Sequence, residues 1–82
     1  MFYFYILKST INKSFYFGSS SNLKKRLSDH NKGKCKSTKN GKPYELIYYE
    51  AYIEKRLAIK RELHIKKSGK ERDSLLKRLN QI

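Results

Sequence analysis

Residues 16–27 read YFGSSSNLKKRL, and this stretch is the most informative part of the chain. It runs from an aromatic strand through Gly18 and a short serine turn into a basic helix. Serine and asparagine are good N-caps, so the helix is predicted to begin near Ser21 or Asn22 and to stop before Gly33. Its inward positions fall on one narrow stripe and are Leu23, Leu27 and His30.

A second aromatic run, FYFYIL at residues 2–7, lies upstream and is typical of a strand buried on both faces. Asn12 and Lys13 supply a turn, so residues 15–17 are predicted to return as the second strand of a hairpin. With a connection of about four residues, Tyr5 is expected opposite Tyr16 on one face of the ladder.

The rest of the chain predicts an α+β fold. Residues 31–43 form a mobile basic loop, 46–49 a third strand and 54–67 a second helix. Ser68 and Gly69 break the chain before a C-terminal helix at about 70–82. The order strand, strand, helix, strand, helix, helix predicts a small antiparallel three-stranded sheet with helices packed on it. Residues 1–82 are expected to form a single domain.

Composition points to a polyanionic partner. The 82 residues carry 20 Lys and Arg against 7 Asp and Glu, a net charge of +13. Most of these bases are lysines, which favour sequence-tolerant phosphate binding. Cys35 is the only cysteine, which excludes an internal disulfide and fits a cytoplasmic location. The apolar run at 2–7 is far shorter than a membrane span of about 20 residues, so no membrane contact is expected.

The two aromatic tripeptides and the helical arginine closely resemble the GIY-YIG nuclease domain, in particular its small stand-alone members. The resemblance runs from about Phe2 to Lys67. Tyr5, Tyr16 and Gly18 match the family letters directly, whereas other residues replace the remaining glycine and isoleucines of the motif. Further resembling segments are residues 37–39, 43–46 and 60–62.

The resemblance implies a metal-dependent DNA endonuclease that hydrolyses phosphodiester bonds, in DNA repair or recombination. Tyr5 and Tyr16 would then turn their hydroxyls toward the attacking water, and Gly18 would end its strand and allow close phosphate approach. A phenol with a pKa near 10 is a poor base, so Arg26 and the metal would have to lower it. Both tyrosines could equally be aromatic residues that fill a core.

Arg26 and His30 are four residues apart and therefore neighbours on one helix face. An arginine fork matches two phosphate oxygens, so Arg26 is the candidate for stabilising charge on the phosphate, although it could be one of many solvated bases. His30 would contact the scissile phosphate or relay a proton, but a histidine at a helix end often only caps carbonyls.

Glu62 falls between Ala58 and Ile65 on an otherwise apolar helical stripe, where a carboxylate needs a partner. The partner could be a basic neighbour. The resemblance instead implies that Glu62 holds one Mg²⁺ or Mn²⁺ ion, which suits a single carboxylate with several waters. His64 faces away from Glu62 and is not expected to be a ligand.

The surface lysines near the first helix are the expected DNA-backbone contacts: Lys24, Lys25, Lys32, Lys34, Lys36, Lys39 and Lys42. Cys35, in the same loop, has no partner for nucleophilic work.

Two departures from the family leave rival functions open. Ser19 stands where some repair nucleases carry a lysine, and no asparagine aligns with the one that many members use near the metal. Because one metal and a small site favour cutting one strand at a time, we still expect a nicking endonuclease with little sequence specificity. The alternatives are a non-catalytic DNA-binding module of the same fold and a basic RNA- or ribosome-associated protein.

Overall fold

The computed structural model describes residues 1–82, and its elements follow the predicted order. They are β1 (Phe2–Ser9), β2 (Phe15–Ser20), α1 (Leu23–Asn31), the 3₁₀ helix η1 (Lys39–Gly41), β3 (Tyr44–Tyr52), α2 (Lys55–Lys67) and α3 (Gly69–Arg78). The strands form one antiparallel sheet in the order β2-β1-β3, which confirms the predicted α+β architecture. No helix is both long and apolar enough to span a membrane.

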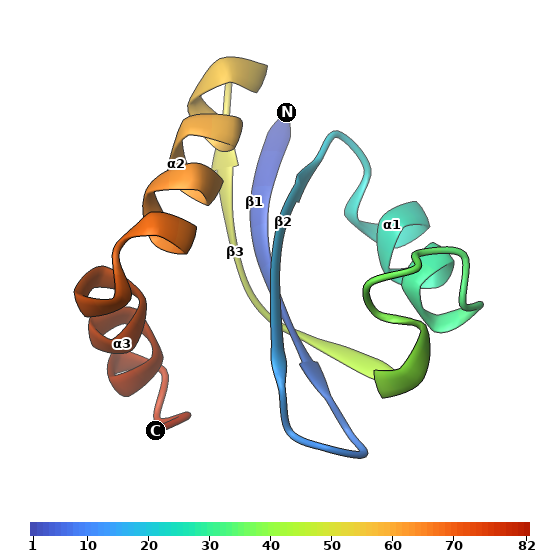
Figure 1. Cartoon of the computed structure of the whole chain (residues 1–82). Helices are drawn as coiled ribbons and strands as arrows, with labels where there is room; N and C mark the ends of the chain where they lie inside the picture. The colour runs from blue at the N-terminus through green and yellow to red at the C-terminus, as the bar shows by residue number, and fades with distance from the viewer.

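The sheet lies between two helical layers, with α1 on one face and α2 and α3 on the other (Figure 1). Successive side chains of β1 point to opposite faces, so this central strand serves two cores. The core toward α2 and α3 consists of Phe4, Ile6, Ile65 and Leu75. The core toward α1 consists of Tyr5, Leu7 and Tyr44.

The predicted hairpin is present, but its predicted register is wrong. Tyr5 pairs with Gly18, and Tyr16 pairs with Leu7. The Ser9 amide donates to the Ser14 carbonyl at 2.8 Å, so residues 10–13 form the turn and shift the pairing by two. A shift of two keeps both tyrosines on the same face, where their ring centroids are 6.3 Å apart.

The third strand begins earlier than predicted because a side chain from α1 holds its first residue. Asn31 accepts from the Tyr44 amide at 2.6 Å and donates to the Tyr44 carbonyl at 3.2 Å. A bulge in β3 follows, since Ile6 pairs with Tyr48 while Leu7 pairs with Leu46. The bulge changes which face the later side chains of β3 reach.

Parts of the basic loop at 31–43 pack against the protein. Thr38 is 1% exposed, and Gly41 lies under the buried Ser9, whose hydroxyl donates to the Gly41 carbonyl at 2.6 Å. The break between α2 and α3 is at Ser68 alone, which ends α2 and caps α3 by accepting from the Glu71 amide. Gly69 is already helical.

Candidate functional site

Tyr5 is the central side chain of the candidate site. It lies on the middle strand and is 1% exposed. A Cβ added to Gly18 would lie 2.5 Å from the Tyr5 hydroxyl oxygen and 2.7 Å from its Cζ, closer than real Cβ atoms come. Gly18 is therefore a glycine because the Tyr5 phenol lies across its backbone.

A buried hydrogen-bonded chain leads from Tyr5 through α1 to the basic loop. The Tyr5 hydroxyl is 3.0 Å from His30 Nε2, and His30 Nδ1 is 2.7 Å from Thr38 Oγ1. The Thr38 hydroxyl donates to the Cys35 carbonyl at 3.3 Å, so it accepts from Nδ1–H. His30 Nε2 is then left free to accept the Tyr5 proton, which assigns the tautomer by its partners.

Burial sets the protonation of this pair. It lowers the pKa of His30, and the nearby Arg26 charge acts in the same direction, so the imidazole is neutral at neutral pH. Burial also raises the pKa of Tyr5 to about 12, despite the opposing effect of Arg26. Arg26 thus lowers the pKa of this phenol, as expected, but without a metal burial outweighs it and the pKa stays above its ordinary value of about 10.

Tyr16 lies beside this pair at the edge strand β2. Its ring centroid is 4.8 Å from that of His30. The sheet and α1 therefore bring together three of the four predicted catalytic side chains: Tyr5, Tyr16 and His30.

Arg26, the fourth, is half-buried on α1 and contacts Tyr5. Burial acts to lower the pKa of Arg26, but the combined effects of Tyr5, Cys35 and Tyr16 outweigh it, so the pKa is raised. No carboxylate lies within 4.0 Å of its guanidinium. By contrast, Arg61, the partly buried arginine of α2, is paired with Glu50. The guanidinium fork of Arg26 is thus free to bind an anion.

Glu62 approaches the site from α2, across the edge of β2. Its Oε1 accepts from the Ser19 hydroxyl at 2.7 Å, and its Oε2 accepts from Lys66 Nζ at 2.6 Å. Lys66 Nζ also lies 5.7 Å from the centre of the Tyr16 ring. Glu62 is thus paired with a basic neighbour, one of the two possibilities that the sequence left open. It reaches the site through Ser19, which donates to it, and through Lys66, which lies over the Tyr16 ring.

The donors near Glu62 fit one hard divalent ion. No group of three or more His, Cys, Asp or Glu side chains could hold a metal anywhere in the chain. One carboxylate beside a single serine hydroxyl would suit an ion that keeps most of its water, such as Mg²⁺ or Mn²⁺, and does not suit zinc.

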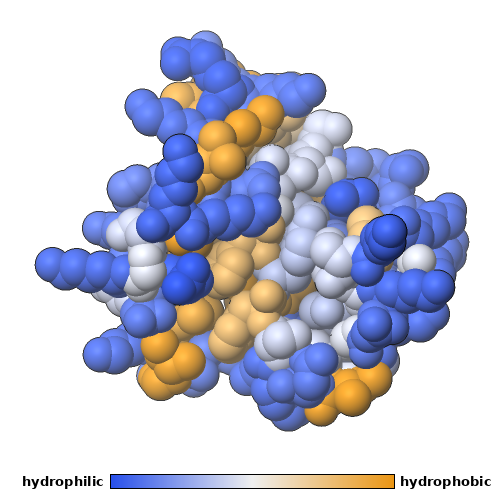
Figure 2. Space-filling model, viewed as in Figure 1, coloured by the Kyte–Doolittle hydropathy of each residue, from blue (hydrophilic) through white to orange (hydrophobic).

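The predicted DNA-binding lysines are all exposed, on α1 and in the loop that follows it. Lys25 and Lys34 share Asp29, at 3.1 and 3.9 Å, while the other five have no carboxylate within 4.0 Å. Hydrophilic side chains cover the side of the molecule where α1 and this loop lie (Figure 2). The basic surface therefore adjoins Arg26.

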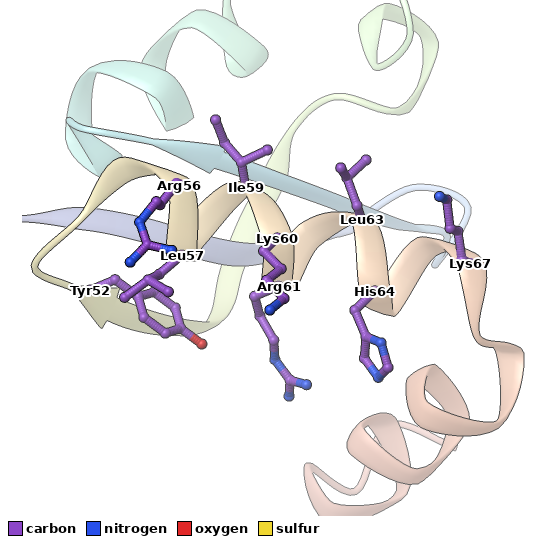
Figure 3. A pocket seen from close by; sticks show the side chains of 9 residues that line it. All are labelled: Tyr52, Arg56, Leu57, Ile59, Lys60, Arg61, Leu63, His64 and Lys67. Carbon is purple, nitrogen blue, oxygen red and sulfur yellow. The ribbon is translucent and has the colours of Figure 1, made fainter.

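A shallow groove on the outer face of α2 is separate from this site (Figure 3). Its lining includes His64, Lys67, Leu63 and Ile59, but not Glu62. His64 therefore lies away from Glu62, as predicted.

Sequence reasoning missed Thr38 and Lys66. The four-residue spacing from Glu62 to Lys66 is a signal that could have identified their pairing. No spacing could have identified Thr38, because its contact with His30 depends on how the loop folds back.

The sequence matches the GIY-YIG catalytic domain model over residues 1–80. A UPF0213 protein of Bacillus pumilus is 43% identical over 65 residues, which are 78% of this chain and 65% of that protein. UPF0213 protein YazA of Bacillus subtilis is 39% identical over 74 residues, 89% of this chain and 74% of the relative. UPF0213 protein CPE1444 of Clostridium perfringens is 44% identical over 68 residues, 82% and 72% of the two chains. The chain spans slightly less than two thirds of the first of these relatives.

A solved structure has the same fold. The solution NMR structure of the UPF0213 protein BH0048 from Bacillus halodurans superimposes with a TM-score of 0.58 at 28% identity. The match covers 96% of this chain and 85% of that one.

Proposed function

The chain belongs to the GIY-YIG family, and from this premise we propose that it is a divalent-metal-dependent DNA endonuclease that nicks one strand at a time. The observation that carries the proposal is the buried Tyr5–His30 pair beside Arg26, an arginine without an acidic partner. Packing alone does not need this arrangement, because burying polar groups gains little stability over apolar ones.

In this reaction Arg26 binds the scissile phosphate. Its guanidinium carries two parallel donors that match two phosphate oxygens, and its half-buried position strengthens the interaction relative to water. The contact opposes the negative charge that develops as water attacks the phosphorus atom.

Tyr5 and His30 remove the proton from the attacking water. With a pKa of about 12, Tyr5 is a phenol at neutral pH and cannot accept a proton unless it loses its own. His30 Nε2 accepts the hydroxyl proton of Tyr5 while the Tyr5 oxygen takes one from water. Thr38 keeps Nδ1–H engaged, so the proton acceptor is always Nε2. The Tyr16 ring, on β2, lies beside the Tyr5–His30 pair and would line the position of the attacking water.

Glu62 would hold one Mg²⁺ or Mn²⁺ ion, with Ser19 fixing the orientation of its carboxylate. When bound, such an ion supplies Lewis acidity to a phosphoryl oxygen and positive charge near the leaving group.

The exposed lysines of α1 and the following loop would bind the DNA backbone with little dependence on sequence. Preference would come from DNA shape or distortion, which suits repair or recombination intermediates in the cytoplasm.

One observation favours a second candidate, a DNA-binding module of this fold without catalysis. Both Glu62 oxygens are engaged within the protein, and Ser19 replaces a cation that some family members have. Such a module would bind DNA but leave it intact.

Incubation of supercoiled plasmid with the purified protein and Mg²⁺ or Mn²⁺ distinguishes the two candidates. We expect nicked circles that disappear with chelator and with Glu62→Gln, a variant that keeps the size of the side chain. A protein that shifts the plasmid on a gel but never nicks it would be the binding module.

A further inference from the structure

Lys66 is held in an unusual position between the metal-binding candidate and the edge of the sheet. It lies one turn after Glu62 on α2, with Nζ 2.6 Å from Glu62 Oε2 and 5.7 Å from the centre of the Tyr16 ring. The Lys66 side chain is 42% exposed, whereas that of Glu62 is 18% exposed. The ammonium therefore covers the carboxylate from the solvent side.

A divalent cation cannot bind Glu62 without affecting this pair. Two cations on one carboxylate repel each other, to an extent that solvent screens in this partly exposed pair. The Ser19 hydroxyl is neutral and can stay on Oε1, so Lys66 is the partner that must leave. No other carboxylate lies within 4.0 Å of Lys66 Nζ.

The released ammonium remains close to the place where a DNA phosphate would bind. Lysine has a long, flexible stem, and this one already lies over Tyr16, whose ring contacts His30. A phosphate beside Tyr16 would be the anion within its reach.

We propose that Lys66 is a substrate-binding cation of this site: it pairs with Glu62 when no divalent metal is bound and moves to the DNA phosphate when metal binds. This inference rests on the proposed nuclease function. Metal binding and phosphate binding then both depend on the Lys66 side chain. Its ammonium neutralises Glu62 in the free enzyme and binds a phosphate in the DNA-bound enzyme.

The first test measures Mn²⁺ affinity by calorimetry without DNA. Lys66→Gln removes the competing charge and should bind Mn²⁺ about two- to fivefold more tightly, given the usual strength of exposed ion pairs. Lys66→Arg keeps the charge and should bind as weakly as wild type. Lys67→Gln is the matched control, because Lys67 lines the outer groove of α2 and should leave the affinity unchanged (Figure 3).

The second test measures nicking at saturating DNA and Mn²⁺. Lys66→Gln should be slower by about tenfold or more, Lys66→Arg should recover most of the rate, and Lys67→Gln should match wild type. Wild-type Mn²⁺ affinity in Lys66→Gln would overturn the inference, and so would a wild-type nicking rate. If wild type itself binds no Mn²⁺ and nicks nothing, the proposed nuclease function is wrong. If wild type binds Mn²⁺ and nicks DNA but the Lys66 variants do not differ as expected, only the role of Lys66 is wrong.

Discussion

The two faces of β1 differ in the side chains that they contact. Phe4 and Ile6 face α2 and α3 and belong to an apolar cluster, with the Arg61 guanidinium 5.8 Å from the centre of the Phe4 ring. Tyr5, between them in sequence, faces α1, and its hydroxyl begins a buried hydrogen-bonded chain. One strand thus supplies both hydrophobic core residues and the hydroxyl that we propose takes part in catalysis. We therefore expect substitutions on the α2 and α3 face to affect mainly stability, and substitutions on the α1 face to affect nicking as well.

The largest effect should come from the apolar face. Ile65→Ala creates a cavity beside Phe4 and Ile6 and should lower the free energy of unfolding by about 2–5 kcal/mol. Ile59 lies on the same helix but is 38% exposed, so Ile59→Ala should cost about 1 kcal/mol or less. Urea denaturation measures both variants. Equal losses would mean that this face is not the main source of stability.

Gly18→Ala should disrupt packing on the α1 face of β1, around Tyr5. The new Cβ would collide with the Tyr5 phenol, so either the ring or β2 must move. We expect a loss of about 1–3 kcal/mol in stability and on the order of a hundredfold in nicking rate. Gly69→Ala is the matched control, because its nearest contact is a 3.4 Å approach to Arg72, and it should be neutral in both assays. A fully active Gly18→Ala would show that Tyr5 need not stay where it is.

Thr38→Val tests the end of the polar chain. Valine keeps the shape but leaves His30 Nδ1–H without an acceptor, which should cost about 1–2 kcal/mol and slow nicking. Thr38→Ser restores the hydroxyl and should recover the nicking rate. If serine and valine behave alike, Thr38 only fills space.

The smallest effect concerns pH. Burial lowers the pKa of His30 below its ordinary 6.5, so the unfolded chain binds a proton more readily than the folded protein does. Stability from this group is therefore fully present above about pH 6.5 and falls as pH decreases below it. Melting temperatures at about pH 7.5 and pH 5 should show this loss in wild type and less of it in His30→Gln. An unchanged loss in the variant would assign the pH dependence to other groups.

The sequence was sufficient to predict those elements whose structure follows from local periodicity. The continuous apolar run of residues 2–7, the N-cap near Asn22 and the stripe of Leu23, Leu27 and His30 are all confirmed by the structure. The hairpin register was not predictable, because the Ser9 hydroxyl accepts from two turn amides, at Ile11 and Asn12, and so fixes where the turn closes.

The sequence was enough to name most residues of the candidate site, but not their hydrogen bonds or protonation states. Tyr5 and His30 could be named from the motif, but their hydrogen bond and the raised pKa of Tyr5 depend on burial that only packing creates. The contact of Thr38 likewise needs the loop to fold back onto α1. Residues 37–39 resemble the family, but no spacing in the sequence predicts that Thr38 reaches His30.

In the proposed reaction, Arg26 acts on the scissile phosphate instead of adding to the general positive field. Arg26→Ala and Lys24→Ala each remove one charge from α1, and a screened field should treat them alike. At saturating DNA and metal, we expect Arg26→Ala to nick on the order of a hundredfold more slowly, while Lys24→Ala loses affinity but nicks within a fewfold of the wild-type rate. Equal nicking rates for the two variants would contradict the account.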